Sequence, residues 1–277
     1  MSKKKITIPE LLDIKKSGRK FKMITGYDYP MATMIDRSDA ELILVGDSLG
    51  MVIQGHEGTI PVNIEDTIYH VKAVRRGAPN TFVVGDMPFL SYQISKEEAI
   101  RNAGMLLKAG ADCVKIEGGI KVVDTVRAVV DAGIPVIAHI GLTPQTAAML
   151  GGFKVQGKNA EAAEKLLNEA VALEEAGAFA IVLECIPTPL AKLIDEKLHI
   201  PTIGCGAGPH TTAQNLNAYD LLGIFDKFVP KFVKQYGKLG SQMVEIFNTW
   251  CNEIDTGVYP APENGFTMKD EELKRLY

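Results

Sequence analysis

The chain has 277 residues, a net charge of −4 at neutral pH, 46% apolar residues and 23% charged residues. This length and composition are typical of one globular α/β barrel with a large core. The negative charge argues against nucleic-acid binding, and no stretch reaches the roughly 18 apolar residues of a membrane span. The basic start at residues 1–5 leads into no apolar segment, so we expect no secretory signal. The four cysteines lack CxxC spacing, which favours reduced thiols in a cytoplasmic protein.

Short apolar runs alternate with amphipathic segments along the chain. An N-terminal helix is expected over residues 7–16, where Thr7 can cap it and Pro9 fits its first turn. Further helices are expected at 31–37, 64–76, 95–108, between 118 and 132, at 160–176 and at 190–198. Strands are expected at 21–25, 42–45, 81–86, 113–117, 135–139, 180–184 and 201–206, with an eighth at 217–222.

Strands that alternate with helices predict right-handed βαβ units and a parallel sheet. About eight units in one chain favour a closed (β/α)8 TIM barrel over an open doubly wound sheet. Polar side chains stand at the carboxyl ends of several expected strands, and only a barrel brings all of those ends to one mouth. We therefore expect residues 1–277 to form a single barrel domain with an N-terminal helix and a C-terminal extension.

Three acids, Asp47, Asp86 and Glu117, follow or end neighbouring strands. Buried together, these carboxylates would repel one another, and a divalent cation would remove that cost. Oxygen ligands without a Cys/His cluster favour Mg²⁺. Taken singly, each acid could equally be a solvated loop or helix-cap residue. Lys115 lies on the same strand face as Glu117 and would add positive charge for a substrate, or merely form an ion pair with it.

Three further residues near strand ends are candidates for binding or catalysis. Ser48 follows Asp47 and offers a hydroxyl to an oxygen-bearing substrate. Glu184 ends an apolar strand, a setting that raises a carboxyl pKa and suits a general base; the alternative is an acid at the start of the next helix. His139 could orient substrate or be a hydrogen-bonded core histidine. These residues together predict a metal-dependent barrel acting on an oxyacid.

Several long motifs resemble those of the ketopantoate hydroxymethyltransferase family. They include Gly-Asp-Ser-Leu-Gly at 46–50, Lys-Ile-Glu-Gly-Gly at 115–119 and His-Ile-Gly-Leu-Thr-Pro-Gln at 139–145. Segments 23–30, 151–158, 201–208 and 259–263 are also similar to that family. The matches occur in the family's order from about residue 8 to residue 208.

The resemblance implies transfer of a hydroxymethyl group from 5,10-methylenetetrahydrofolate to 3-methyl-2-oxobutanoate, which yields 2-dehydropantoate in pantothenate synthesis. By position, Asp47 and Asp86 would bind Mg²⁺, with Glu117 completing the site directly or through water. A second group of residues would hold the 2-oxoacid: Asp47, Ser48, Asp86 and Lys115. Glu184 would accept the C3 proton. The resemblance also implies a cytoplasmic homo-oligomer, typically a decamer.

Two segments depart from the family pattern. The usual Asp-Gly-Gln-Val-Leu-Val is Thr-Ala-Gln-Asn-Leu-Asn at 212–217, which predicts a weaker or differently solvated eighth strand. The loop at 54–60 also differs from the usual Gly-Tyr-Asp-Ser-Thr-Leu. Two alternatives remain open. One is a paralogue that uses another 2-oxoacid or cleaves C–C bonds like the phosphoenolpyruvate mutase/isocitrate lyase group; the other is a non-catalytic barrel that binds oxyacids or serves as an assembly subunit.

Overall fold

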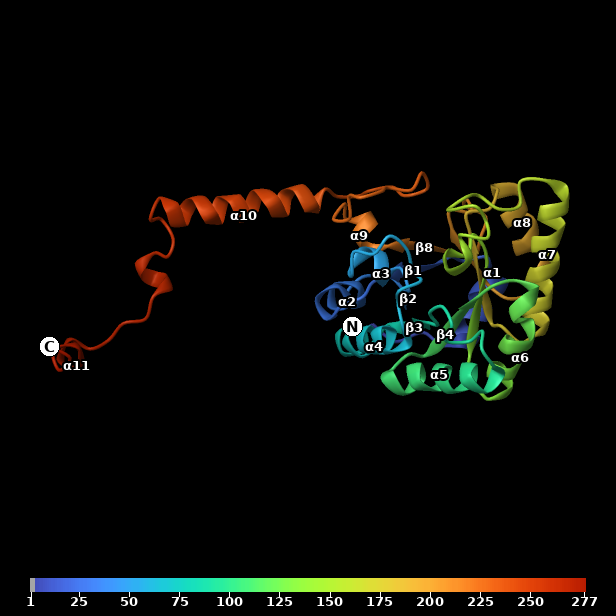
Figure 1. Cartoon of the computed structure of the whole chain (residues 1–277), viewed down its shortest axis with the longest axis horizontal. Helices are drawn as coiled ribbons and strands as arrows, with labels where there is room; N and C mark the ends of the chain where they lie inside the picture. The colour runs from blue at the N-terminus through green and yellow to red at the C-terminus, as the bar shows by residue number, and fades with distance from the viewer. Residues whose placement is uncertain (1–2) are drawn as a thin grey trace.

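A computed structural model describes residues 3–277, so the first two residues of the basic start lie outside it. Eight parallel strands form a closed barrel in chain order, which confirms the predicted TIM-barrel fold (Figure 1). Strand β8 closes the barrel against β1 over five residue pairs. The strands are β1 Phe21–Thr25, β2 Leu42–Val45, β3 Phe82–Asp86, β4 Cys113–Glu117, β5 Val136–Gly141, β6 Ala180–Glu184, β7 Thr202–Cys205 and β8 Ala213–Asn217.

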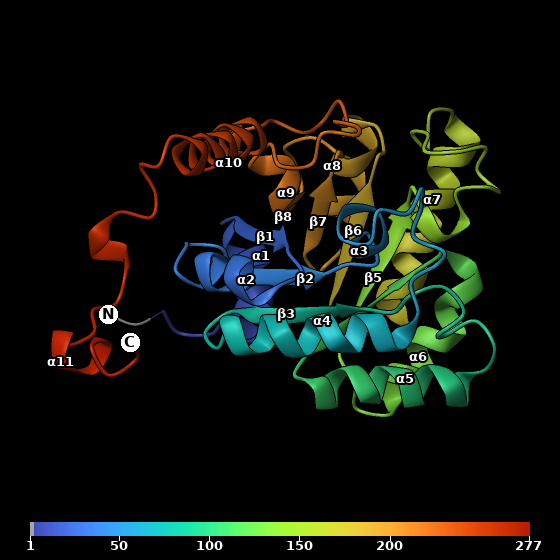
Figure 2. The same cartoon turned by 60° about the vertical axis from the view of Figure 1, so that its left-hand side comes forward.

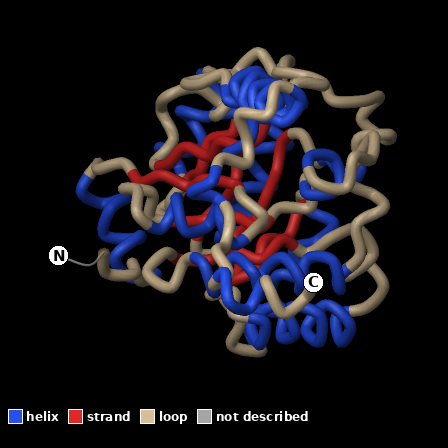
Figure 3. Tube along the Cα trace, turned by 90° about the vertical axis from the view of Figure 1, so that its left-hand side faces the viewer, coloured by secondary structure: helices blue, strands red, loops and turns tan. Residues whose placement is uncertain are grey.

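Helices surround the strands on the outside of the barrel (Figure 3). Two of them begin with side-chain caps that the sequence predicts: Thr7 and Glu10 form a capping box at α1, and Ser95 accepts from Glu98 N–H at α5. The helices are α1 Ile8–Ser17, α2 Tyr29–Asp36, α3 Leu49–Val52, α4 Ile64–Gly77, α5 Lys96–Ala109, α6 Val123–Asp131, α7 Ala160–Glu175, α8 Thr188–Lys197, α9 Ala218–Leu221, α10 Leu239–Asp255 and α11 Asp270–Leu273. Short 3₁₀ turns are η1 Ile120–Val122, η2 Pro144–Thr146 and η3 Pro262–Asn264.

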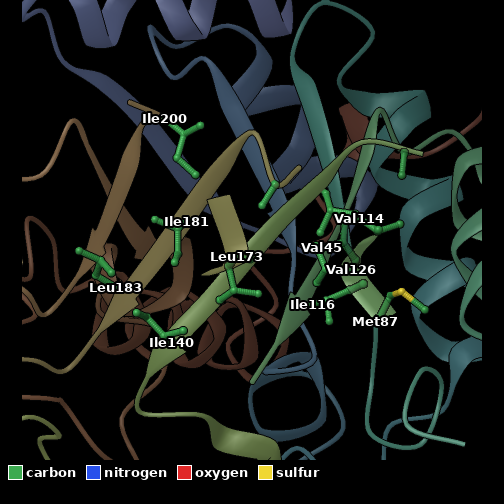
Figure 4. Packing of buried hydrophobic residues seen from close by; sticks show 14 of the residues in the cluster. Val45, Met87, Val114, Ile116, Val126, Ile140, Leu173, Ile181, Leu183 and Ile200 are labelled. Carbon is green, nitrogen blue, oxygen red and sulfur yellow. The ribbon is translucent and has the colours of Figure 1, made fainter. Parts of the chain in front are cut away.

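Each strand divides its side chains between two cores, because successive residues point to opposite faces. In β2, Leu42 and Leu44 face the barrel interior, where α1 adds Leu11 and closes the amino-terminal end. The intervening residues pack against the surrounding helices, and Figure 4 shows Val45 in that outer core. Burying one such leucine contributes about 1.5–3 kcal/mol. The inward rows end in polar side chains at the opposite, carboxyl end.

The eighth strand lies four residues earlier than predicted. Residues 213–217 form β8, whereas 218–221, placed in a strand by the sequence prediction, form α9. The prediction of this strand was wrong because β8 has no apolar run: its sequence Ala-Gln-Asn-Leu-Asn places Asn215 and Asn217 within the strand. Asn215 instead points inward, where its Oδ1 accepts from Thr25 Oγ1 at 3.0 Å. Internal hydrogen bonding therefore compensates for the poor strand propensity of asparagine.

The C-terminal extension leaves the barrel after α9. Figures 1 and 2 show α10 and α11 reaching away from the strands, with the C-terminus at the far end. None of the α10 residues is buried. No helix within residues 3–277 combines the length and apolar character needed to cross a bilayer. The wall near β7 and β8 is thinly covered, because β7 runs into β8 without a helix and β8 is followed only by the short α9.

Candidate active site

The predicted site residues converge at the carboxyl-terminal mouth of the barrel. Register places Asp86 beside Lys115, and Glu117 beside His139. Their side chains share the inward face of the strands and are 2–5% exposed, whereas Glu184 is 19% exposed. The site is thus a buried charged floor with one more accessible carboxylate beside it.

Lys115 is the centre of the charged floor. Its Nζ lies 2.8 Å from Asp86 Oδ1, 3.8 Å from Glu117 Oε2 and 3.3 Å from His139 Nδ1. Burial opposes its charge, but the surrounding carboxylates raise the pKa of Lys115 above its ordinary value. Lys115 therefore carries a permanent positive charge toward the mouth.

Asp47 and Asp86 are held next to each other. The Asp47 N–H donates to Asp86 Oδ2 at 2.9 Å. Burial and mutual repulsion raise the pKa of Asp47 well above its ordinary value. Burial also raises the pKa of Asp86, although Lys115 partly offsets that shift. Two adjacent buried carboxylates with raised pKa values favour a neutralising cation.

Mg²⁺ fits this pair of carboxylates by the chemistry of its donors. Hard oxygen ligands and space for water or substrate oxygens suit Mg²⁺, which commonly uses only one or two carboxylates. Asp86 Oδ1 and Glu117 Oε2 accept no aligned hydrogen bond from residues 3–277, despite the ion-pair contacts of Lys115. Across the same residues, no three His, Cys, Asp or Glu side chains form a ready-made metal group. The open oxygen of Asp86, together with the adjacent Asp47 and its raised pKa, makes Asp47 and Asp86 a suitable pair for a cation.

Glu117 faces the protein more than the mouth. Its Oε1 accepts from Gln145 N–H at 2.8 Å, and its Oε2 lies 3.4 Å from His139 Nδ1. Burial alone would raise its pKa, but His139 and Lys115 lower the pKa of Glu117 below its ordinary value. Glu117 is thus anionic and balances the two cationic neighbours.

His139 connects that floor to Glu184. Its Nε2 lies 3.3 Å from Glu184 Oε2. Burial and Lys115 oppose protonation of the ring, but Glu117 and Glu184 raise the pKa of His139 to about 9. A close approach of β5 to β6 permits this contact: a Cβ on Gly141, whose φ is 98°, would lie 2.2 Å from the Glu184 carbonyl oxygen. His139 is therefore a cation whose contact can hold the Glu184 side chain in place.

Gln145 and Tyr92 complete the floor but were not singled out from the sequence. Gln145 Nε2 donates to Asp47 Oδ2 at 3.0 Å and to the Met87 carbonyl at 2.9 Å. Its Oε1 accepts from Tyr92 Oη–H at 2.7 Å. Gln145 is the last residue of the motif at 139–145 that resembles the family. That motif is the sequence signal that points to Gln145 as a site residue. Its contacts bridge Asp47 and Glu117 across the mouth.

Ser48 belongs to a separate polar row beside Asp47. Its Oγ lies 2.7 Å from Tyr27 Oη, which accepts from Asn217 Nδ2 at 2.6 Å. Ser48 is partly exposed, whereas Tyr27 is buried. The sequence prediction included Ser48 but neither of the residues behind it. Ser48 presents its hydroxyl at the edge of the acidic floor.

The closed barrel and its mouth of buried lysine and carboxylates define a TIM-barrel protein with an enzyme-type site. The model of the ketopantoate hydroxymethyltransferase family matches residues 5–262, and the chain belongs to that family. The 3-methyl-2-oxobutanoate hydroxymethyltransferase of Heliobacterium modesticaldum is 58% identical over 275 residues, covering 99% of each chain. The enzyme of the same name from Enterococcus faecalis is 53% identical over 94% of this chain and 95% of its own length.

Solved structures of other proteins share the fold. A phosphonopyruvate hydrolase in complex with oxalate and Mg²⁺ has a TM-score of 0.59 and 13% identity, covering 98% of this chain and 97% of its own. An oxaloacetate acetylhydrolase bound to oxalate has a TM-score of 0.60 and 12% identity over 97% of this chain and 93% of its own. At such identities the likeness shows the barrel fold alone.

Proposed function

We propose that this chain transfers a hydroxymethyl group from 5,10-methylenetetrahydrofolate to 3-methyl-2-oxobutanoate, giving 2-dehydropantoate for pantothenate biosynthesis. The observation that carries the proposal is Glu184 at the mouth, beside a cationic His139 and above a buried floor of carboxylates and Lys115. Membership of the ketopantoate hydroxymethyltransferase family supports the same reaction.

Asp47 and Asp86 would hold Mg²⁺, with Glu117 contributing directly or through water. The bound ion would act as a Lewis acid on the keto and carboxylate oxygens of the 2-oxoacid. Lys115 adds positive charge close to the same oxygens, which favours the enolate over the keto form. Ser48 offers a hydrogen bond to the substrate carboxylate.

Glu184 would take the proton from C3 of the bound 2-oxoacid. His139 holds that carboxylate by an ion-pair contact at 3.3 Å and shares the floor with Glu117. Water would hydrolyse the two C–N bonds of the methylene group, which leaves tetrahydrofolate and releases the one-carbon unit as formaldehyde. The electron pair of the broken C3–H bond would then bond to the formaldehyde carbon, and the resulting alkoxide would take back the proton held by Glu184. The base and the charge-stabilising groups therefore act at adjacent atoms of one small substrate.

Product analysis tests the reaction directly. The purified protein with Mg²⁺, 3-methyl-2-oxobutanoate and methylenetetrahydrofolate is expected to form 2-dehydropantoate, identified by mass spectrometry. Omission of Mg²⁺ with a chelator present serves as the control. Cleavage of the 2-oxoacid, or transfer only to another 2-oxoacid, would favour the lyase or paralogue alternative and contradict this proposal.

We further propose that the protein is a homo-oligomer, a decamer by family resemblance, whose contacts involve α10. Apolar side chains recur on one face of that helix at 243, 247, 250 and 254, all at least 41% exposed. The helix also points away from its own thinly covered barrel wall (Figure 1). We propose a second copy of the chain as the partner of α10, because that copy has the same thinly covered wall near β7 and β8, which α10 can cover.

Charge placed on the apolar face of α10 is expected to break the assembly. Light scattering should give the wild type a mass about ten times the 30.1 kDa of one chain. F247D and W250D should give smaller species, because a carboxylate in an apolar contact is poorly solvated. N252D adds the same charge on the opposite face of α10 and should leave the mass unchanged. A monomeric wild type would contradict self-association.

A further inference from the structure

Ser48 is the end of a hydrogen-bonded row that begins on β8. Asn217 Nδ2 donates to Tyr27 Oη at 2.6 Å, and Tyr27 Oη lies 2.7 Å from Ser48 Oγ. Tyr27 is Ser48's one side-chain hydrogen-bond partner within residues 3–277. The row therefore links the end of β8 to a hydroxyl at the mouth of the barrel.

The direction of every hydrogen bond in the row follows from one backbone contact. Tyr219 N–H donates to Asn217 Oδ1 at 3.0 Å, so the amide group cannot be reversed and Nδ2 faces Tyr27. Burial raises the pKa of Tyr27 above its ordinary value, so the phenol keeps its single proton. Within residues 3–277, Tyr27 Oη has two hydrogen-bond partners, Asn217 Nδ2 and Ser48 Oγ. Because Nδ2 cannot accept, Ser48 Oγ is the acceptor for the Tyr27 proton.

The Ser48 oxygen accepts from Tyr27, which leaves the Ser48 hydrogen free to point into the mouth. A hydroxyl held in this orientation is a donor to an anionic oxygen, and a hydrogen bond to a charged group is stronger than one between neutral groups. Asn217, at the end of β8, supplies this orienting contact.

We propose that Asn217 and Tyr27 are positioning residues that fix Ser48 as a hydrogen-bond donor to the carboxylate of the 2-oxoacid. The inference rests on the proposed function, since it assumes that Ser48 meets the acceptor substrate. It assigns a role to β8, which orients the group that binds the substrate carboxylate.

N217D reverses the row with little change in shape. One Asp oxygen can still accept from Tyr219 N–H, but the other accepts the Tyr27 proton, so Ser48 must turn its hydrogen toward Tyr27. We expect KM for 3-methyl-2-oxobutanoate to rise about 10- to 100-fold, the loss of a hydrogen bond to a charged group. The value of kcat should change far less, because Ser48 contacts the carboxylate rather than C3.

A double-mutant cycle separates orientation from simple repulsion by the new charge. In an S48A background, N217D should raise KM no further if it acts through Ser48. If N217D still raises KM in that background, the cause is charge repulsion and the inference is wrong. N215D is the matched control, because it adds a carboxylate on the same inward face of β8 next to Thr25.

The remaining outcomes are also decisive. N217V removes the donor without reversing the row and should raise KM less than N217D; circular dichroism verifies that both variants fold. If the wild type forms 2-dehydropantoate but N217D leaves KM unchanged, the inference fails while the proposed function stands. If the wild type itself forms none, the proposed function fails first.

Discussion

E184Q is expected to abolish exchange of the C3 proton of 3-methyl-2-oxobutanoate. The amide cannot accept the proton, and loss of a general base costs about 10²–10⁴ in rate. The measurement is deuterium incorporation at C3 by NMR, with Mg²⁺ present and no folate, so that proton removal is observed without carbon–carbon bond formation. Binding of the 2-oxoacid should persist, because Asp47, Asp86 and Lys115 are unchanged.

E175Q is the matched control for this experiment. It makes the same chemical change on the exposed surface at the end of α7 and should exchange at the wild-type rate. The wild type should also lose exchange when a chelator removes Mg²⁺. Exchange in E184Q at the wild-type rate would show that another group takes the proton, and Glu184 would then retain only its contact with His139.

Much of this site could be predicted because two simple geometric rules hold in a parallel barrel. Alternation along β4 puts Lys115 and Glu117 on one face, and parallel strands bring their carboxyl ends to one mouth. Apolar runs mark seven strands for the same reason. The sequence therefore predicts which polar side chains meet, although not the distances between them.

The features that the sequence does not predict depend on contacts between residues far apart in the chain, which no local pattern encodes. Gln145 lies on a short 3₁₀ turn without periodicity, and its amide meets Asp47, 98 residues earlier in the chain. The sequence does not predict β8 at residues 213–217, because the polar residues Asn215 and Asn217 give this segment the pattern of a loop. The apolar stripe of α10 is present in the sequence, but no local pattern shows that this helix leaves the barrel and stays exposed.

D47N is expected to abolish catalysis while making the metal-free protein more stable. Burial and the neighbouring acids raise the pKa of Asp47 well above its unfolded value, so its ionised form opposes folding at neutral pH. Asparagine keeps an oxygen for Gln145 Nε2 and removes the charge. In a chelator, D47N should have the higher Tm, by about 2–4 °C for each kcal/mol of stability gained.

The dependence of Tm on pH and on Mg²⁺ tests this explanation for the stability of D47N. Because the folded-state pKa of Asp47 is raised, the cost of its charge is absent below the unfolded pKa near 3.8 and grows as pH rises toward the folded-state value. The advantage of D47N should therefore be larger at pH 8 than at pH 4. Mg²⁺ should raise the Tm of the wild type and not of D47N, whereas D124N, an exposed acid, should respond like the wild type. An equal rise of Tm with Mg²⁺ in D47N would show that Asp47 is not a ligand of the proposed metal site. The loss of a true ligand would weaken Mg²⁺ binding and with it the stabilisation of the fold.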